Sequence, residues 1–188
     1  MPGWDDLPGW VIYLATDDMA ATHEAVKAAG GQPVMEPMQV GSFGTMGLWT
    51  DPTGALFGAW QGDEHQGFAI VDEPGAVAWC DYLSVDFESA KSFFNEAFGF
   101  TYDPMGEGYA MYSVPDQREQ PAGGIGQAEE GMTPGWNVCF HVEDIDTALQ
   151  FGLGYPAGPF AMIDQLGAEQ VLAVLEDLRG AGSLPADA

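Results

Sequence analysis

One carboxylate in the sequence stands where a strand would hold it beside an aromatic ring. Asp81 follows Trp79 by two residues within a run of aromatic and aliphatic residues. Because side chains of a strand alternate between faces, Trp79 and Asp81 should face the same side of a sheet. A carboxylate inside a pocket can act as a general base or orient a ligand. Asp81 is therefore our candidate catalytic residue, and the alternative is an acid satisfied within the fold or exposed at a sheet edge.

Aromatic residues recur in the segments that we expect to be strands. Six of them can line an apolar pocket for a planar or hydrophobic small molecule, and they can equally form the core. His141 has the opposite strand parity to Trp136, and is either a ligand contact or a packed or surface histidine. The candidate ligand-binding residues are Trp10, Tyr13, Trp60, Trp79, Tyr82, Trp136 and His141.

Other kinds of catalytic site are missing from the sequence. No nucleophile, histidine and acid stand at a readable catalytic spacing, and no Gly-rich phosphate loop precedes a helix. Two cysteines, Cys80 and Cys139, are too few for a disulfide framework or a zinc cluster. Each lies in an apolar run, so we expect both to be buried structural thiols. We expect no cofactor.

A repeat places the candidate residues on similar elements. The triplet Pro-Gly-Trp at 8–10 and at 134–136 precedes a strand-like run that ends in an acidic pair, and residues 78–86 form a third copy. In each copy a Trp opens a short strand. An Asp or Glu then caps the start of a helix. Such periodicity indicates repeated supersecondary units.

The copies predict the organisation of the chain. Strand and helix signals follow the order βαβββ twice and begin it a third time. The expected fold class is α+β, with repeated βαβββ units forming a curved mixed sheet and a short α-helical C-terminal tail. The expected parts are a first unit at 7–62, a linker at 63–75, a second unit at 76–128, an incomplete third unit at 134–149 and a helical tail at 150–188.

Motifs in both complete units point to a known superfamily. The first unit carries W-x-x-Y-L-x-x-D-D from Trp10, then G-G from Gly30, then D-P-x-G-A-x-F-x-x-W from Asp51. The second carries P-G-A-x-x-W from Pro74, then D-x-x-x-A-x-x-F-F from Asp86 and F-G-F at 98–100. With these motifs, residues 7–149 resemble the vicinal oxygen chelate superfamily, which includes glyoxalases, extradiol dioxygenases and bleomycin-resistance proteins.

The resemblance implies a cup of paired units around a ligand. Enzymes of the superfamily hold a divalent metal with His, Glu or Gln, and the metal acts as a Lewis acid. One ligand comes from near the start of a unit's first strand and another from its last strand. Carried over, these sites fall near Trp10, Trp79, Trp136 and Gly58, none of which can ligate a metal. We therefore expect no metal at the usual site.

These observations favour a small-molecule-binding protein of the glyoxalase/bleomycin-resistance type without the usual metal site. Two alternatives stay open. One is a metal-dependent lyase, isomerase or dioxygenase of the same superfamily, and the other is a chimeric or truncated fold fragment without activity. The expected partner is a hydrophobic or aromatic small molecule, and the incomplete third unit favours a homodimer.

The tail carries a different pattern. Asp144–Leu149, the segment 154–160 rich in Gly and Pro, and Asp164-x-x-Gly167 resemble the helical C-terminal domain of 3-hydroxyacyl-CoA dehydrogenases. The sequence contains no G-x-G-x-x-G loop, so it lacks the dinucleotide fingerprint of such enzymes. We do not expect a functional dehydrogenase. The tail is expected to supply helical packing or dimer contacts.

The charge balance limits the possible partners. The chain has 188 residues, with 29 acidic and 4 basic ones, and a formal net charge of −25. Without a basic patch it is unsuited to nucleic acid or an anionic membrane surface. The N-terminal residues lack the features of a signal peptide, and no run approaches the roughly 18 apolar residues of a membrane span. We expect a cytoplasmic protein.

Overall fold

The computed structural model describes residues 11–71, 73–115, 117–153, 159–167, 170 and 172–173. The chain divides into two regions, Met1–His141 and Val142–Ala188, which are described separately. The larger region holds two copies of one strand and helix arrangement, which we call the first and second modules. The smaller region holds the helices α3 (Ile145–Leu153) and α4 (Pro159–Leu166).

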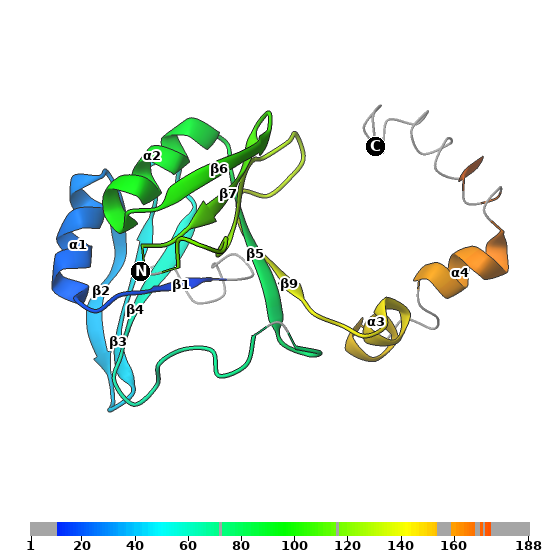
Figure 1. The fold of residues 1–188 in the computed structure, drawn as a ribbon, viewed down its shortest axis with the longest axis horizontal. Coiled ribbons are helices and arrows are strands. Elements are labelled where there is room, and N and C mark those ends of the chain that lie inside the picture. The colour runs from blue at the N-terminus through cyan, green and yellow to red at the C-terminus, as the bar shows by residue number, and fades with distance from the viewer. Residues whose placement is uncertain are drawn as a thin grey trace. The chain divides into compact units, whose positions relative to one another are not determined.

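The first module is a four-stranded mixed sheet with one helix (Figure 1). Its strands stand in the order β1-β4-β3-β2, with β1 parallel to β4 and the other neighbours antiparallel. The first and last strands of the module are therefore paired. The elements are β1 (Tyr13–Ala15), α1 (Met19–Ala28), β2 (Gln32–Val40), β3 (Gly44–Thr50) and β4 (Leu56–Gly62).

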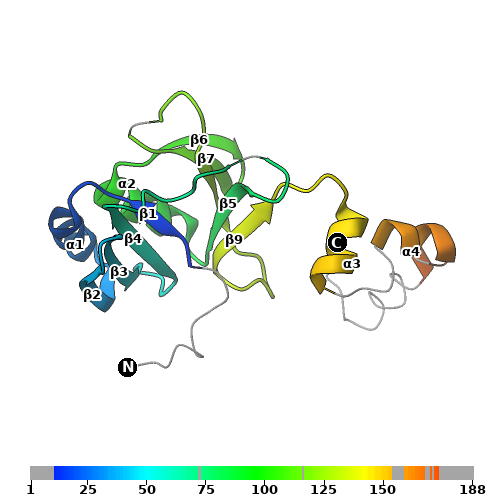
Figure 2. The ribbon, with the colours of Figure 1, turned by 90° about the horizontal axis from the view of Figure 1, so that it is seen from below.

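The second module repeats this arrangement and gains one strand. Its sheet has the order β6-β7-β8-β5-β9, with β5 parallel to β8. Figure 2 shows β9 beside β5, to which it is antiparallel, so β9 pairs with the edge of β5 that β8 leaves free. The elements are β5 (Val77–Ser84), α2 (Phe87–Phe98), β6 (Thr101–Gly106), β7 (Tyr109–Ser113), β8 (Gly123–Gln127) and β9 (Gly135–Phe140).

This arrangement confirms the predicted fold class. The described residues form mixed sheets and a few short helices, as an α+β protein should. Among the helices of the described segments, none combines the length and the hydrophobicity needed to cross a bilayer.

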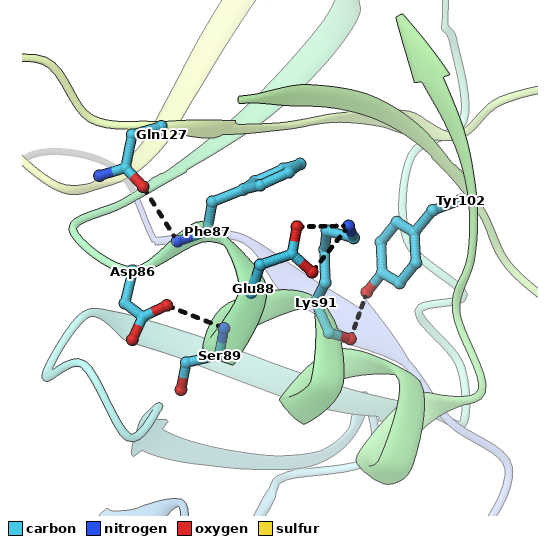
Figure 3. A network of polar contacts seen from close by, with 7 residues as sticks. All are labelled: Asp86, Phe87, Glu88, Ser89, Lys91, Tyr102 and Gln127. Atoms are coloured by element: carbon cyan, nitrogen blue, oxygen red, sulfur yellow. Dashed lines mark hydrogen bonds and ion pairs between the residues drawn. The ribbon is translucent and has the colours of Figure 1, made fainter. Parts of the chain in front are cut away.

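Helices α1 and α2 begin with the same pair of polar contacts. The carboxylates of Asp18 and Asp86 each accept the backbone N–H of the residue three positions later. Gln61 and Gln127, near the ends of β4 and β8, accept the first helical N–H through their side-chain oxygens. Figure 3 shows both contacts at the start of α2. Because a helix N-terminus otherwise leaves several donors unpaired, these contacts fix each helix start against its own sheet.

The two modules share one hydrophobic core. Helices α1 and α2 contact each other, and Figure 1 shows them as neighbours. Phe57 of β4 meets Phe93 and Phe94 of α2 edge-on, with ring centroids 5.5 and 5.6 Å apart. Edge-to-face pairs add to the energy of burial. Because these rings come from different modules, the buried side chains of both modules form one continuous cluster.

A buried hydrogen bond also joins the modules. The Tyr82 hydroxyl on β5 donates to Asp51 Oδ2 at 2.6 Å, and the two residues are 1% and 2% exposed. Asp51 begins the turn between β3 and β4, where its Oδ1 accepts the backbone N–H groups of Thr53 and Ala55. Burial and the neighbouring Asp51 charge raise the pKa of Tyr82, which keeps its phenol as the donor.

Replacement of Tyr82 by Phe should destabilise the fold. The substitution keeps the ring but removes the shorter of two hydrogen bonds to a buried Asp51 oxygen, which retains only the Thr53 hydroxyl at 3.0 Å, a loss of about 1–3 kcal/mol of unfolding free energy. Urea unfolding followed by far-UV circular dichroism measures the change.

Tyr102→Phe is the matched control for this substitution. The Tyr102 hydroxyl donates to the backbone carbonyl of Lys91 at 2.9 Å, so its loss removes a bond to a neutral group (Figure 3). Its effect should be smaller, because hydrogen bonds to charged groups contribute more. Equal stability of Tyr82→Phe and the unaltered protein would show that the bond between the modules contributes nothing.

Candidate functional site

Alternation along β5 separates the two faces of the second sheet. Tyr82 and Ser84 are buried on the face that packs against α2, where the Tyr82 ring lies 4.9 Å from that of Phe94. Trp79 and Asp81 lie on the opposite face, because neighbouring side chains of a strand point to opposite sides. The core contact of Tyr82 thus determines the face on which Asp81 is presented.

Neighbouring strands add residues beside Asp81. Strand β9 pairs Asn137 with Asp81 and Cys139 with Trp79. From β7, the Tyr109 hydroxyl reaches the Asp81 carboxylate. We call these five residues, Trp79, Asp81, Tyr109, Asn137 and Cys139, the Asp81 face.

The Asp81 carboxylate is held by two neutral donors. Its Oδ1 accepts the indole N–H of Trp79 at 2.9 Å and the hydroxyl of Tyr109 at 2.8 Å. No donor among the described residues reaches Oδ2. Asp81 is partly exposed, so one oxygen orients the group while the other stays able to accept a hydrogen bond from a ligand.

Two pKa shifts show how this carboxylate affects its neighbours. Burial raises the pKa of Tyr109, and its hydrogen bond to Asp81 raises it further. The phenol therefore remains a neutral donor across the physiological pH range. Burial also raises the pKa of Cys80, on the other face of β5, with Cys139 and Asp81 adding to the effect. The Cys80 thiol is thus held in its protonated form.

A glycine makes the Asp81 contacts possible. Gly124 of β8 stands beside Asp81 in the parallel pairing, and a Cβ atom there would overlap both Asp81 Oδ1 and the Tyr109 hydroxyl. The first module has a glycine at the equivalent place. Gly58 pairs with Tyr13, and a Cβ at Gly58 would lie 2.5 Å from Tyr13 Cδ1. In each module, therefore, a glycine of the last strand leaves room for the side chain of the paired first-strand residue, which lies over that glycine.

The predicted aromatic residues do not share one surface. Trp79 lies with Asp81, whereas Tyr82 and Trp136 are buried in the core with ring centroids 5.0 Å apart. Tyr13 and Trp60 belong to the first sheet. Their side chains lie over Gly58 and toward the backbone oxygen of His65, respectively. Trp10 lies outside the described residues, and His141 follows β9 and pairs through its backbone with Ala76.

The spacing to the helix caps explains why two tryptophans separate. Trp79 precedes the cap Asp86 by seven residues, whereas Trp136 precedes Asp144 by eight. Asp144 caps α3 by accepting the N–H of Thr147 at 2.7 Å. A shift of one residue turns a strand side chain to the other face, so Asn137 occupies in β9 the position that Trp79 occupies in β5.

Sequence reasoning missed Tyr109 and Asn137 and misjudged Cys139. Counting back from Asp144 would have found Asn137, but no local signal marks Tyr109, which is 28 residues from Asp81. The prediction of a buried thiol is wrong for Cys139, which is exposed on β9. Its side chain is on the Asp81 face, and β9 carries no further strand of the described residues on its other edge.

The donor set does not fit the metal site that the superfamily implies. Trp79 and Asn137 stand at equivalent first-strand positions, and the last strand of each module has a glycine, Gly58 or Gly124, beside the first-strand residue. The side chains of tryptophan and glycine provide no metal ligand, and the Asn137 amide oxygen by itself is a single neutral ligand. Within the described part of the chain, no three His, Cys, Asp or Glu side chains gather closely enough to hold a metal ion.

A cleft of about 530 Å³ lies elsewhere, at the junction of the two modules. Its walls include Phe98 and Phe100, and its polar groups include Asp17, Thr16 and Thr22. The two threonine hydroxyls hydrogen-bond each other at 2.7 Å. Since Asp17 has no titratable neighbour in the cleft, the arrangement offers no paired groups for chemistry, and we place the candidate site at the Asp81 face.

Sequence comparisons identify relatives of the whole chain and of its tail. CFP32 of Mycobacterium bovis, a protein classed as a glyoxylase, is 31% identical over 182 residues, which cover 93% of this chain and 67% of the relative. The anthracycline biosynthesis protein DauV of Streptomyces sp. strain C5 is 31% identical over 145 residues, with 75% and 52% covered. The chain thus spans about two thirds and about half of these relatives. Residues 138–187 match the C-terminal domain family of 3-hydroxyacyl-CoA dehydrogenase.

Solved structures show the same fold. The Mn(II)-bound glyoxalase of Novosphingobium aromaticivorans aligns with a TM-score of 0.51 at 19% identity, covering 74% of this chain and 48% of that one. The 2,2',3-trihydroxybiphenyl 1,2-dioxygenase of Sphingomonas wittichii RW1 aligns with a TM-score of 0.54 at 15% identity, covering 80% and 61%. With 31% identity to CFP32 over most of its length, the chain belongs to the vicinal oxygen chelate superfamily.

Proposed function

We propose that this chain binds a hydrophobic or aromatic small molecule on the Asp81 face, without a metal ion held there by the protein. The observation that supports this most is the way Asp81 is held. Two neutral donors, the Trp79 indole and the Tyr109 phenol, fix Oδ1 and leave Oδ2 as an acceptor. A fixed carboxylate beside an aromatic ring combines one directional polar contact with apolar area, as ligand sites usually do.

The surroundings of Asp81 suit a flat ligand. Gly124 and Gly126 of β8 carry no side chain, and a Cβ at Gly126 would lie 3.1 Å from Tyr109 Cδ2 and 3.2 Å from Leu83 Cδ2. The Tyr109 ring therefore lies over both glycines, and the Leu83 side chain lies beside Gly126. Partly exposed apolar groups of this kind gain free energy when a planar molecule covers them.

A second candidate function uses the same carboxylate as a base. Asp81 can accept a proton from a bound ligand through Oδ2 while Trp79 and Tyr109 keep the group in place. Such a step belongs to a metal-free isomerase or lyase. The observation that favours it is the unshared oxygen of Asp81, and turnover of a ligand identified by binding would test it.

The proposed setting follows from charge and from the strand edges. The net charge of −25 supports a cytoplasmic protein that contacts neither nucleic acid nor an anionic membrane. Among the described strands, β1 and β2 of the first sheet and β6 and β9 of the second each have a single neighbour. Unpaired edges of this kind favour association, which supports a homodimer.

Replacement of Trp79 by Ala should weaken the binding of a neutral aromatic probe. N-phenyl-1-naphthylamine becomes fluorescent in apolar sites, and its titration gives a dissociation constant for each variant. Loss of one aromatic partner should weaken binding about fivefold, since such contacts contribute about 1 kcal/mol.

Trp60→Ala serves as the matched control, because Trp60 is a partly exposed tryptophan on the first sheet. Its dissociation constant for the probe should stay close to that of the unaltered protein. The proposed site is wrong if Trp60→Ala weakens binding and Trp79→Ala does not, with both variants shown to be folded by their urea unfolding curves.

The protein should not retain a stoichiometric divalent metal. After dialysis against MnCl₂ and gel filtration, metal analysis should find well below one Mn²⁺ per chain, because the usual ligand positions hold Trp79, Asn137 and glycine. One ion per chain, lost in Asp81→Asn and kept in the exposed-acid control Asp103→Asn, would instead show a metal site at Asp81.

A further inference from the structure

We infer that the Asp81 face selects ligands that carry a positive charge, specifically a protonated amine on an aromatic or apolar body. This inference rests on the proposed function, and names the ligand class for that same site. It follows from three observations on the described residues. Asp81 has no basic partner among them, both lysines pair with acids on the helices, and two aromatic rings lie beside the carboxylate.

Asp81 has no cationic partner within the described part of the protein. The ion pairs formed there involve Lys27, Lys91 and His23, and none of them includes Asp81. Its two hydrogen-bond donors, an indole and a phenol, are neutral. A partly buried carboxylate without a counter-ion gains most from a ligand that brings the missing positive charge.

Both lysines pair with acids on the helices. Lys27 bonds Glu24 at 3.1 Å on α1, and Lys91 bonds Glu88 at 3.0 Å on α2 (Figure 3). Helix α2 covers the opposite face of the second sheet from Asp81. An anionic ligand such as a carboxylate or phosphate would therefore face the Asp81 charge without a compensating lysine. The net charge of −25 adds a field that attracts cations.

The aromatic groups favour the same ligand class. The Trp79 indole and the Tyr109 ring each direct a polar edge at Asp81 Oδ1, so their apolar parts lie near the carboxylate and can contact the aromatic body of a ligand whose ammonium binds Oδ2. Asn137, paired with Asp81 across the strands, adds a neutral side chain and no repelling charge.

Three naphthalene compounds of similar size test the inference. They are 1-naphthylmethylamine, which is protonated at pH 7, the neutral 1-naphthalenemethanol and the anion 1-naphthaleneacetate. Tryptophan fluorescence titration of the full chain at low salt should give the tightest binding for the amine, about tenfold or more over the alcohol, and the weakest for the anion.

The variant Asp81→Asn separates charge from shape. It keeps the size of the side chain and removes its charge, so the preference for the amine over the alcohol should fall to near one while the alcohol still binds. The exposed-acid control Asp103→Asn should keep the preference of the unaltered protein. High salt should weaken the amine more than the alcohol.

The possible results distinguish this inference from the proposed function. Equal binding of amine and alcohol, with loss of both in Trp79→Ala, overturns the charge preference and leaves the small-molecule site in place. A preference for the amine that survives in Asp81→Asn also overturns the inference, because the net charge alone would then account for it. Failure of all three compounds to bind overturns the inference and the proposed function together.

Discussion

The buried hydrogen bond from Tyr82 to Asp51 is the contact on which the arrangement of the larger region depends. Tyr82 belongs to β5 and Asp51 to the turn after β3, so the 2.6 Å bond couples the second module to the first. It also sets the faces of β5. With Tyr82 in the core, the preceding residue, Asp81, must face away from it, because strand side chains alternate. The candidate site thus rests on a contact made on the other side of the sheet.

The two modules share two structural features, a glutamine that binds the helix start and a glycine in the last strand. Gln61 and Gln127 both tie the last strand of a module to the first turn of its helix. Gly58 and Gly124 both make room for a residue of the first strand. In the first module that residue is Tyr13, and in the second it is Asp81. The same geometry therefore holds a tyrosine ring in one copy and an oriented carboxylate in the other, so at this position only the second module presents a carboxylate.

Short-range features of the sequence predicted more than long-range ones. The strand period placed Trp79 beside Asp81, and the capping role of Asp86 was readable from its position before an apolar helix. The fold class followed from the repeat. The sheet face on which each tryptophan lies was harder to predict. Trp79 and Trp136 look equivalent in the repeat until the number of residues between each tryptophan and its helix cap is compared.

Contacts between distant residues were beyond the sequence. Tyr109 meets Asp81 only because β7, β8 and β5 are adjacent in register, and Tyr82 meets Asp51 only because the modules share a core. Neither pairing leaves a mark in the local composition. The same holds for Cys139, whose apolar neighbours suggested burial although its strand lies at the edge of the sheet.

The most direct test of the proposed site is to follow the assigned indole N–H signals in ¹H–¹⁵N spectra during titration with 1-naphthylmethylamine. Binding at the Asp81 face should move the Trp79 signal with saturation and leave the signals of the core residues Trp49 and Trp136 in place. Movement of a core indole signal with a static Trp79 signal would contradict binding at this face.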